Sequence, residues 1–475
     1  MIHLISNRSF MMKKKKELSI DPFVLVFIVI VACGLATFII PPGILENGVY
    51  TALPRNAVNF NNLFNIFRAF PYGLKESANI FVIILIVGGA LEIAKKSGAV
   101  DTGIIYLIQK FGKRSSTAIL ILLIITFSAI GGFMGWVEEL IPFVPLVVMI
   151  VVALGYDTIT AVAICIVGTM GGFMAGPTNL FTVGVCNEII IAMGLTNGNT
   201  DVFQGIQLRL IVWVLVTMIS IVYILIYAKR VKSDPLKSLT YGIDISELQL
   251  DTSGQQVSLS IRHILILLTF VGALVLSIIG MKSGIDGVIW SFDDVSGAFF
   301  LAAVLIGIIA KISPSDIANA FIFGAKESLS GALIVGIARG VYWVLKTANV
   351  TDTIVYNATL LLEGTSPLVA AIGIVIIVSL INGLIPSGSG KGALLAPIMV
   401  PIATSLGLTS QTAVLAYQWG DGITNMFWFT FGTLLIFLNY GKVPINKWYR
   451  FFIPLMAIFF VLAIIVLAIA VKIGY

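Results

Sequence analysis

Two polar segments interrupt an otherwise apolar chain, and their residue types suit a small molecule that carries charges of both signs. The first segment supplies two neighbouring carboxylates, Glu138 and Glu139. The second supplies hydroxyl groups, a flexible backbone and an amine, from Ser387, Gly388, Ser389, Gly390 and Lys391. A carboxylate can hold a guanidinium in a bidentate pair, and glycine lets backbone N–H groups converge on an anion. We therefore predict that both segments bind substrate.

A Gly-x-Thr-Asn motif occurs twice, at residues 176–179 and 422–425, each time inside an apolar stretch. Pro177 removes a backbone donor and the glycines weaken the helix, so each motif is expected to interrupt a helix and free its carbonyl groups. The side chains that could act as ligands at these breaks are Thr178, Asn179, Asp421, Thr424 and Asn425. One motif alone could be a simple kink, but its recurrence favours a binding role.

The charged residues also have a simpler explanation, because Glu138 and Lys391 could be rim residues in water. At membrane depth, however, a carboxylate is costly unless it meets a cation, a proton or a buried partner. At that depth, Glu138 and Glu139 would predict a cationic substrate. Lys391 could bind the carboxylate of that substrate, or it could replace a sodium ion as a tethered charge.

The two halves of the chain resemble each other. The stretch at residues 73–77, GLKES, returns as GAKES at residues 324–328, which is 251 residues downstream. Basic residues follow the first predicted helix at Lys95-Lys96 and precede its counterpart at Lys326, so we expect the halves to be inverted relative to each other. In secondary transporters built from inverted repeats, the substrate site lies at the repeat interface.

Composition predicts that most of the chain lies in lipid. Hydrophobic residues make up 58% of the sequence and charged residues only 11%. Apolar runs of spanning length, such as residues 24–40 and 451–471, predict an all-α polytopic membrane protein with two inverted repeats. A β-barrel is excluded because its strands would alternate apolar and polar residues.

The remaining composition argues against several functional classes. The net charge of +6 comes largely from lysines and arginines in short loops, which places these loops and the N-terminus in the cytoplasm and gives no indication of nucleic-acid binding. Three cysteines and two histidines offer neither metal-ligand spacing nor a catalytic constellation. We therefore predict no enzyme activity, no metal and no cofactor.

Polar and apolar stretches divide the chain into seven predicted parts. They are a basic cytoplasmic tail (1–21), a first transmembrane helix with an outer loop (22–70), the first inverted repeat (71–228), a cytoplasmic linker (229–262), inter-repeat transmembrane helices (263–320), the second inverted repeat (321–450) and a C-terminal transmembrane helix (451–475).

Two apolar runs, residues 117–130 and 367–381, are short for a membrane crossing. Fourteen helical residues cover about 21 Å, whereas the hydrocarbon core is roughly 30 Å thick. Either ordinary spans are joined by surface loops, or each run is one arm of a re-entrant hairpin with a polar tip near the midplane, at residues 131–142 and 383–394. Because both halves share the short run, we favour the hairpin in both.

A repeat of scaffold helices, a hairpin with a Gly/Ser-type tip and a broken Gly-x-Thr-Asn helix resembles the ion transporter superfamily. Over residues 20–472, the chain is similar to the YfcC family, which stands beside the DcuC-type C4-dicarboxylate carriers and includes arginine/ornithine antiporters. The resemblance implies a secondary transporter of the bacterial inner membrane, a homodimer in which a transport part moves as an elevator against a fixed scaffold. In sodium-coupled dicarboxylate members both tips are similar to Ser-Asn-Thr. The departures at residues 136–139 and 387–391 argue against sodium coupling and against a dianionic substrate.

The first functional hypothesis is an exchanger for basic or zwitterionic amino acids, such as arginine against ornithine. The alternative keeps the architecture but makes the chain a proton- or sodium-coupled carrier of C4-dicarboxylates or small peptides. A channel fits less well, because the sequence shows broken helices and no repeated selectivity filter. The expected partners are a small-molecule substrate, amino acid or dicarboxylate, and the lipid bilayer.

Overall fold

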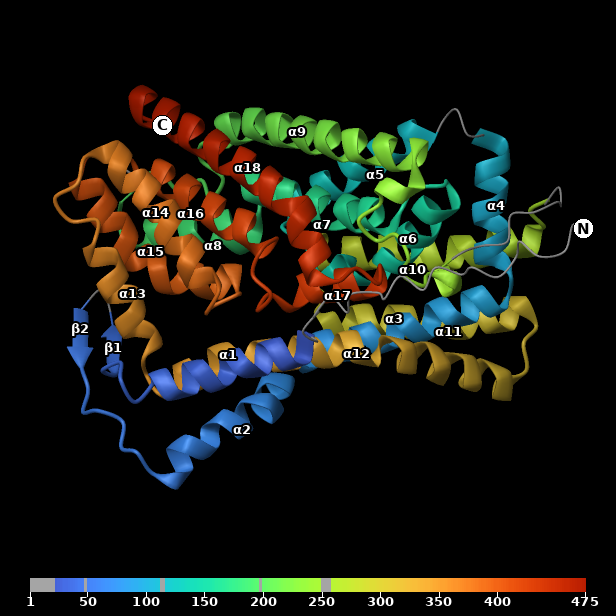
Figure 1. Ribbon diagram of the computed structural model, residues 1–475, viewed down its shortest axis with the longest axis horizontal. Coiled ribbons are helices and arrows are strands. Elements are labelled where there is room, and N and C mark those ends of the chain that lie inside the picture. The colour runs from blue at the N-terminus through green and yellow to red at the C-terminus, as the bar shows by residue number, and fades with distance from the viewer. Residues whose placement is uncertain (1–21, 47–48, 112–115, 196–198, 249–257) are drawn as a thin grey trace, which may run out of the picture.

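The computed structural model describes residues 22–46, 49–111, 116–195, 199–248 and 258–475. The predicted basic tail (1–21) and residues 249–257 of the predicted linker lie outside the described residues. Most of the described chain is helical (Figure 1), and eight of its helical segments are long and apolar enough to cross a membrane. The prediction of an all-α polytopic membrane protein is confirmed.

The described residues of the first half form nine α-helices. They are α1 (Pro22–Ala36), α2 (Phe60–Glu76), α3 (Ala78–Lys96), α4 (Ala99–Phe111), α5 (Ser116–Ala129), α6 (Val144–Ala153), α7 (Thr158–Ala175), α8 (Val185–Ala192) and α9 (Ile206–Ser233). Two short strands, β1 (Gly43–Glu46) and β2 (Val49–Ala52), pair antiparallel between α1 and α2.

The second half contributes nine more helices in the described part of the chain. They are α10 (Ile261–Ser283), α11 (Phe292–Ala310), α12 (Pro314–Thr347), α13 (Thr351–Leu360), α14 (Pro367–Asn382), α15 (Gly388–Ser405), α16 (Ser410–Asn425), α17 (Gly432–Tyr440) and α18 (Ile445–Ile473).

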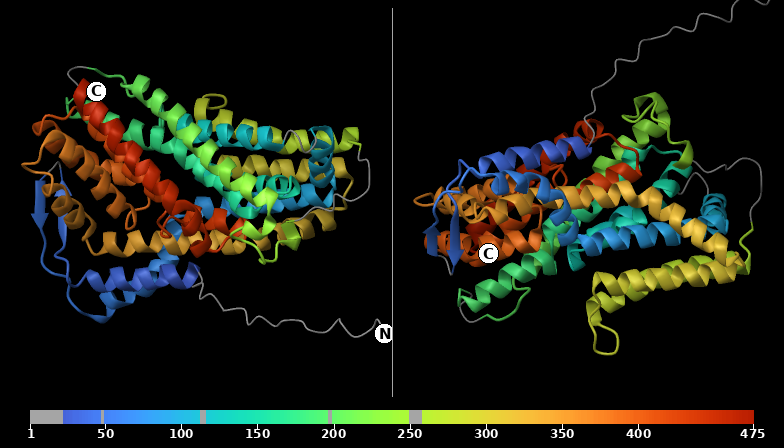
Figure 2. Two further views of the ribbon diagram at one scale, coloured as in Figure 1. Left: turned by 45° about the horizontal axis from the view of Figure 1, so that its top comes forward. Right: turned by 90° about the horizontal axis from the view of Figure 1, so that it is seen from below.

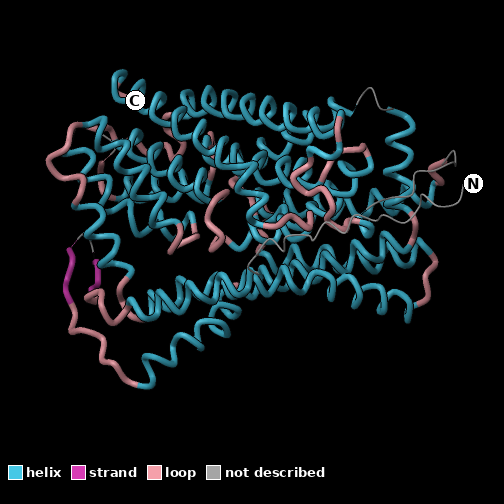
Figure 3. Tube along the Cα trace, viewed as in Figure 1, coloured by secondary structure: helices cyan, strands magenta, loops and turns pink. Residues whose placement is uncertain are grey.

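Helices α7 and α16 form the centre of the protein. Every residue of both helices is buried, and Gln418 of α16 donates a hydrogen bond of 2.8 Å to the carbonyl oxygen of Phe173 in α7. In Figure 1 the α1–α3 helices and the long helix α12 form a layer below them. Figure 3 shows that loop segments interrupt the helices inside the bundle as well as at its ends. The interior therefore contains helix ends whose polar groups need partners within the protein.

Helix α12 packs along α2 and α3 (Figure 2), and the contacts near its two ends show that it runs antiparallel to them. At the end of α3, the Nζ of Lys96 lies 3.0 Å from Asp316 near the start of α12. In the middle, the backbones of Gly88 and Gly324 approach closely, because a Cβ added at Gly324 would lie 2.2 Å from the Gly88 carbonyl oxygen. Small residues allow such close packing of membrane helices. Helix α3 and the later part of α12 are the predicted counterparts in the two halves, and their opposite directions fit an inverted repeat. The inversion of the complete repeats stays a prediction.

The first short apolar run continues further than the sequence indicates. Helix α5 passes into a π-helical turn, Ile130–Met134, and the combined segment of 19 residues is long and apolar enough to span a membrane. The π turn forms where Gly131 packs against α7, since a Cβ added there would lie 2.0 Å from the Thr169 carbonyl oxygen. The first apolar run is therefore short for a membrane crossing only when its α-helical part is counted alone. Helices α6 and α14 remain shorter apolar helices, and re-entrance of both hairpins stays a prediction.

Replacing Gly324 with Ala should destabilise the packing of α3 on α12. The added methyl group meets backbone that cannot rotate away, so the free energy of unfolding should fall by about 1–3 kcal/mol. The measurement is the thermal unfolding midpoint of the purified protein in detergent. Gly272→Ala is the matched control, because a Cβ at Gly272 of α10 has no atom within 4 Å. Equal unfolding midpoints for both variants would contradict the close approach.

Candidate functional site

The first hairpin tip joins the π turn of α5 to a 3₁₀ helix at Glu138–Phe143. Gly135 has a left-handed backbone with φ of 75°, and a Cβ there would lie 2.3 Å from the amide oxygen of Asn179. Glu139 accepts a hydrogen bond of 3.0 Å from the backbone N–H of Val137. The tip is therefore shaped by a glycine and by one of the two predicted carboxylates.

The break between α7 and α8 lies at the first Gly-x-Thr-Asn motif, as predicted. Helix α7 ends where Gly176 takes a left-handed backbone with φ of 41°. The buried Asn179 then caps the next segment, because its side-chain oxygen accepts the N–H groups two and three residues later, at 3.0 and 3.3 Å. Thr178 donates a 2.7 Å hydrogen bond to the carbonyl oxygen of Phe133 in the first tip. The broken helix and the first tip are thus bonded to each other.

The second Gly-x-Thr-Asn motif does not itself break a helix, which corrects the sequence-based expectation. Residues 422–425 form the last turn of α16, and the interruption follows at residues 426–431. Ile423 stands where the first motif has Pro177, so the backbone donor is retained. Thr424 lies within this helical turn, and its hydroxyl donates to the carbonyl oxygen of Gly420 four residues earlier at 2.6 Å.

The second hairpin tip is held by α15 and α16. The side chain of Ser387 caps α15 by accepting the N–H of Gly390 at 3.2 Å. Tyr417 of α16 donates a hydrogen bond of 2.5 Å to the carbonyl oxygen of Gly388. The serine and glycine residues of this tip therefore start a helix whose N-terminus is fixed against α16.

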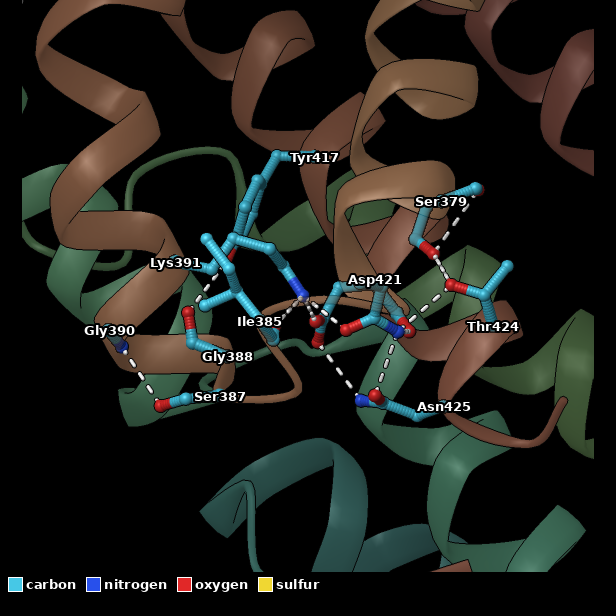
Figure 4. A network of polar contacts seen from close by, with 12 residues as sticks. Ser379, Ile385, Ser387, Gly388, Gly390, Lys391, Tyr417, Asp421, Thr424 and Asn425 are labelled. Atoms are coloured by element: carbon cyan, nitrogen blue, oxygen red, sulfur yellow. Dashed lines mark hydrogen bonds and ion pairs between the residues drawn. The ribbon is translucent and has the colours of Figure 1, made fainter. Parts of the chain in front are cut away.

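Lys391 lies at the centre of a buried polar network (Figure 4). Its ammonium group donates to Asp421 at 2.5 Å, to the carbonyl oxygen of Ile385 at 3.3 Å and to the amide oxygen of Asn382. The side chains of Lys391 and Asp421 are both fully buried. The lysine therefore has its counter-charge inside the protein.

Asn382 connects this ion pair to the end of α16. Its side-chain nitrogen lies within hydrogen-bond distance of Thr424 Oγ1, at 2.9 Å, and of Asn425 Oδ1, at 2.8 Å. The Nδ2 of Asn425 in turn donates to Asp421 Oδ2 at 3.3 Å. Asn382 was not among the site residues predicted from the sequence. The one feature that could have indicated it is an amide side chain directly after the apolar run at residues 367–381.

A cavity of about 260 Å³ lies between the two tips and the helices α3 and α12. Six of the twelve predicted site residues line it, namely Glu138, Glu139, Ser387, Gly388, Ser389 and Asn425. The other six do not, and they are Thr178, Asn179, Gly390, Lys391, Asp421 and Thr424. The volume lies near the lower end for a small-molecule site. The structure thus brings both predicted tips to one small cavity.

Two charged residues of the cavity were missed by sequence reasoning. Arg339 of α12 and Glu76 at the end of α2 line the cavity, and their Nε and Oε2 atoms lie 3.7 Å apart. The Nε of Arg339 has no hydrogen-bond partner among the described residues. Glu138 and Glu139 take part in no ion pair within the described part of the chain. The cavity therefore holds three carboxylates and one guanidinium.

Long apolar helices, interior helix breaks and a small charged cavity are the features of a multi-pass membrane transporter. The chain belongs to the DcuC family, described as C4-dicarboxylate anaerobic carrier, whose match covers residues 19–472. The resemblance drawn from the sequence is confirmed.

The chain is also similar to individual proteins. YfcC of Escherichia coli strain K12, whose provisional name is basic amino acid antiporter, is 30% identical over 416 residues, which cover 84% of this chain and 78% of YfcC. An uncharacterized protein of Haemophilus influenzae is 28% identical over 414 residues, which cover 86% of this chain and 78% of that protein. The crystal structure of the YdaH transporter of Alcanivorax borkumensis is similar at 13% identity, with 95% of this chain and 98% of that chain covered. Its TM-score of 0.41 is too low to add to the argument.

Replacing Asn179 with Ala should lower stability, because two backbone N–H groups of the buried break would lose their acceptor. Loss of a helix cap costs about 0.5–2 kcal/mol, and unsatisfied buried donors add to that. Thermal unfolding of the purified variant tests this. Ser389→Ala is the control, since its side chain makes no hydrogen bond among the described residues and lines the cavity. An unchanged midpoint for Asn179→Ala would refute the capping role.

Proposed function

We propose that the chain exchanges basic amino acids, such as arginine against ornithine, across the bacterial inner membrane. The observation that carries the proposal is the excess of carboxylates in the cavity, where Glu76 faces Arg339 and neither Glu138 nor Glu139 forms an ion pair with any described residue. Carboxylates away from bulk water are expensive without a cation. A guanidinium or ammonium side chain of the substrate would supply one.

The other side of the cavity suits the α-carboxylate of an amino acid. Gly388 and Ser389 line the cavity in the first turn of α15, where backbone N–H groups have no partner within the helix. The positive end of a helix dipole favours an anion at this place. Arg339 offers a second cationic group. A zwitterion with a cationic side chain would therefore meet opposite charges at both of its ends.

The elevator mechanism is part of the same proposal. Two layers meet at the cavity, α3 and α12 on one side and the tips with their broken helices on the other. Movement of the tips and broken helices against α12 would carry the substrate across the membrane, with the N-terminus in the cytoplasm and two copies of the chain forming a homodimer. The inverted relation of the halves would give this movement two equivalent end states.

A proton- or sodium-coupled carrier of C4-dicarboxylates or small peptides is the second candidate. The family description favours it, and Arg339 together with the N-terminus of α15 could hold a carboxylate. Three carboxylates in the same cavity oppose a dianion, because like charges repel at short range.

Replacing Glu138 or Glu139 with Gln should reduce arginine and ornithine exchange while neutral substrates are less affected. The substitution keeps the shape and removes the charge, and a hydrogen bond between charged groups contributes about 1.5–3 kcal/mol, which corresponds to about tenfold or more in affinity. The measurement is counterflow in proteoliposomes with labelled arginine, ornithine, a neutral amino acid and succinate.

Glu247→Gln is the matched control, because Glu247 is exposed, pairs with Lys442 and does not line the cavity. Its exchange rates should equal those of the wild type. Strong succinate transport by the wild type without arginine transport would reject the basic substrate and support the dicarboxylate.

A further inference from the structure

The ammonium group of Lys391 occupies a position that a bound metal cation could also take. All of its partners are oxygen atoms, from the Asp421 carboxylate at 2.5 Å, the Ile385 carbonyl at 3.3 Å and the Asn382 amide. Carboxylate, carbonyl and amide oxygens are the ligands that hard cations prefer. A lysine amine has three donors and no acceptor, so three oxygen partners satisfy it completely.

The position is also one where a cation would influence the cavity. Ile385 lies in the unwound segment between α14 and α15, and Asp421 lies in α16, so the ammonium group joins the second tip to the central helix. Unwound carbonyl groups beside a central helix are where transporters bind their coupling ions. Asn382, one of the three partners of the ammonium group, also donates a hydrogen bond to Asn425, and Asn425 lines the cavity. A cation that could leave this position would therefore change the substrate site when it left.

Lys391 cannot leave. It is covalently part of α15, fully buried, and it neutralises the one carboxylate that a mobile cation would need. Removal of the ammonium group would leave Asp421 as a buried charge without a partner, which is strongly unfavourable. Within the described residues, Asp421 takes part in no other ion pair.

We propose that Lys391 fills a Na⁺-type cation site of the second hairpin as a built-in counter-ion, so that transport by this chain requires no bound Na⁺. The transport part of this inference rests on the proposed exchange of amino acids, whereas the cation site itself does not. A substitution that removes the amine and keeps Asp421 should convert the site into one that binds Na⁺ from solution.

Thermal unfolding of purified protein tests the site without any substrate. Wild type, Lys391→Ala and the double variant Lys391→Ala/Asp421→Asn are expressed and purified in NaCl, then compared in NaCl, LiCl, KCl and choline chloride at equal ionic strength. The wild type should unfold at one temperature in all four salts. Lys391→Ala should gain several degrees in NaCl relative to choline chloride, because a ligand that binds only the folded state stabilises it. The double variant lacks the anionic ligand and should show no such gain.

A Na⁺-specific stabilisation of the wild type would overturn the proposal, as would a folded Lys391→Ala protein that responds equally to all four salts. If Lys391→Ala does not fold, arginine counterflow by the wild type is compared in Na⁺-containing and Na⁺-free media. This comparison tests whether transport requires Na⁺. Equal rates are expected, and a requirement for Na⁺ would refute the built-in counter-ion. Absence of arginine exchange in every medium, together with the expected unfolding pattern, would reject the proposed substrate and keep the cation site.

Discussion

Every polar group at an interior helix break must find its partner within the protein, because lipid offers none. The chain meets this constraint in the same way in both halves, by bonding each break to the hairpin tip beside it. In the first half Thr178 donates to the carbonyl oxygen of Phe133, and in the second half Thr430 donates to the carbonyl oxygen of Gly383. The tips are consequently fixed at the cavity, and the charges that they carry are placed by these bonds.

The charged residues of the two tips differ in their partners. When the sequence is shifted by 252 residues, Lys391 stands at the position of Glu139. Lys391 is neutralised by Asp421 within the protein, whereas Glu139 lines the cavity without an ion pair among the described residues. The net charge offered to a ligand therefore comes from the first tip, with Arg339 and Glu76 on the opposite wall. This difference in charge between the two tips is the physical basis for expecting a cationic substrate.

Sequence patterns predicted the features that depend on local chemistry. Pro177 and its neighbouring glycine identified the first break, and runs of apolar residues identified the spanning helices. The predicted position of the second break was wrong, because Ile423 keeps the backbone N–H donor that Pro177 lacks. Arg339 and Glu76 could not be found, since they lie in ordinary helices and only tertiary packing brings them to the cavity. Lys391 was predicted from the sequence as a substrate-binding residue, which stays a prediction, and its burial against Asp421 could not be predicted because it depends on how α15 packs on α16.

We propose that the cavity selects a cationic amino acid and needs no Na⁺ to bind it. Isothermal titration calorimetry of the purified wild-type protein in a Na⁺-free choline chloride buffer tests both parts at once. We expect saturable binding of arginine and no binding of succinate. Binding of succinate without arginine, or binding of arginine only after NaCl is added, would contradict it.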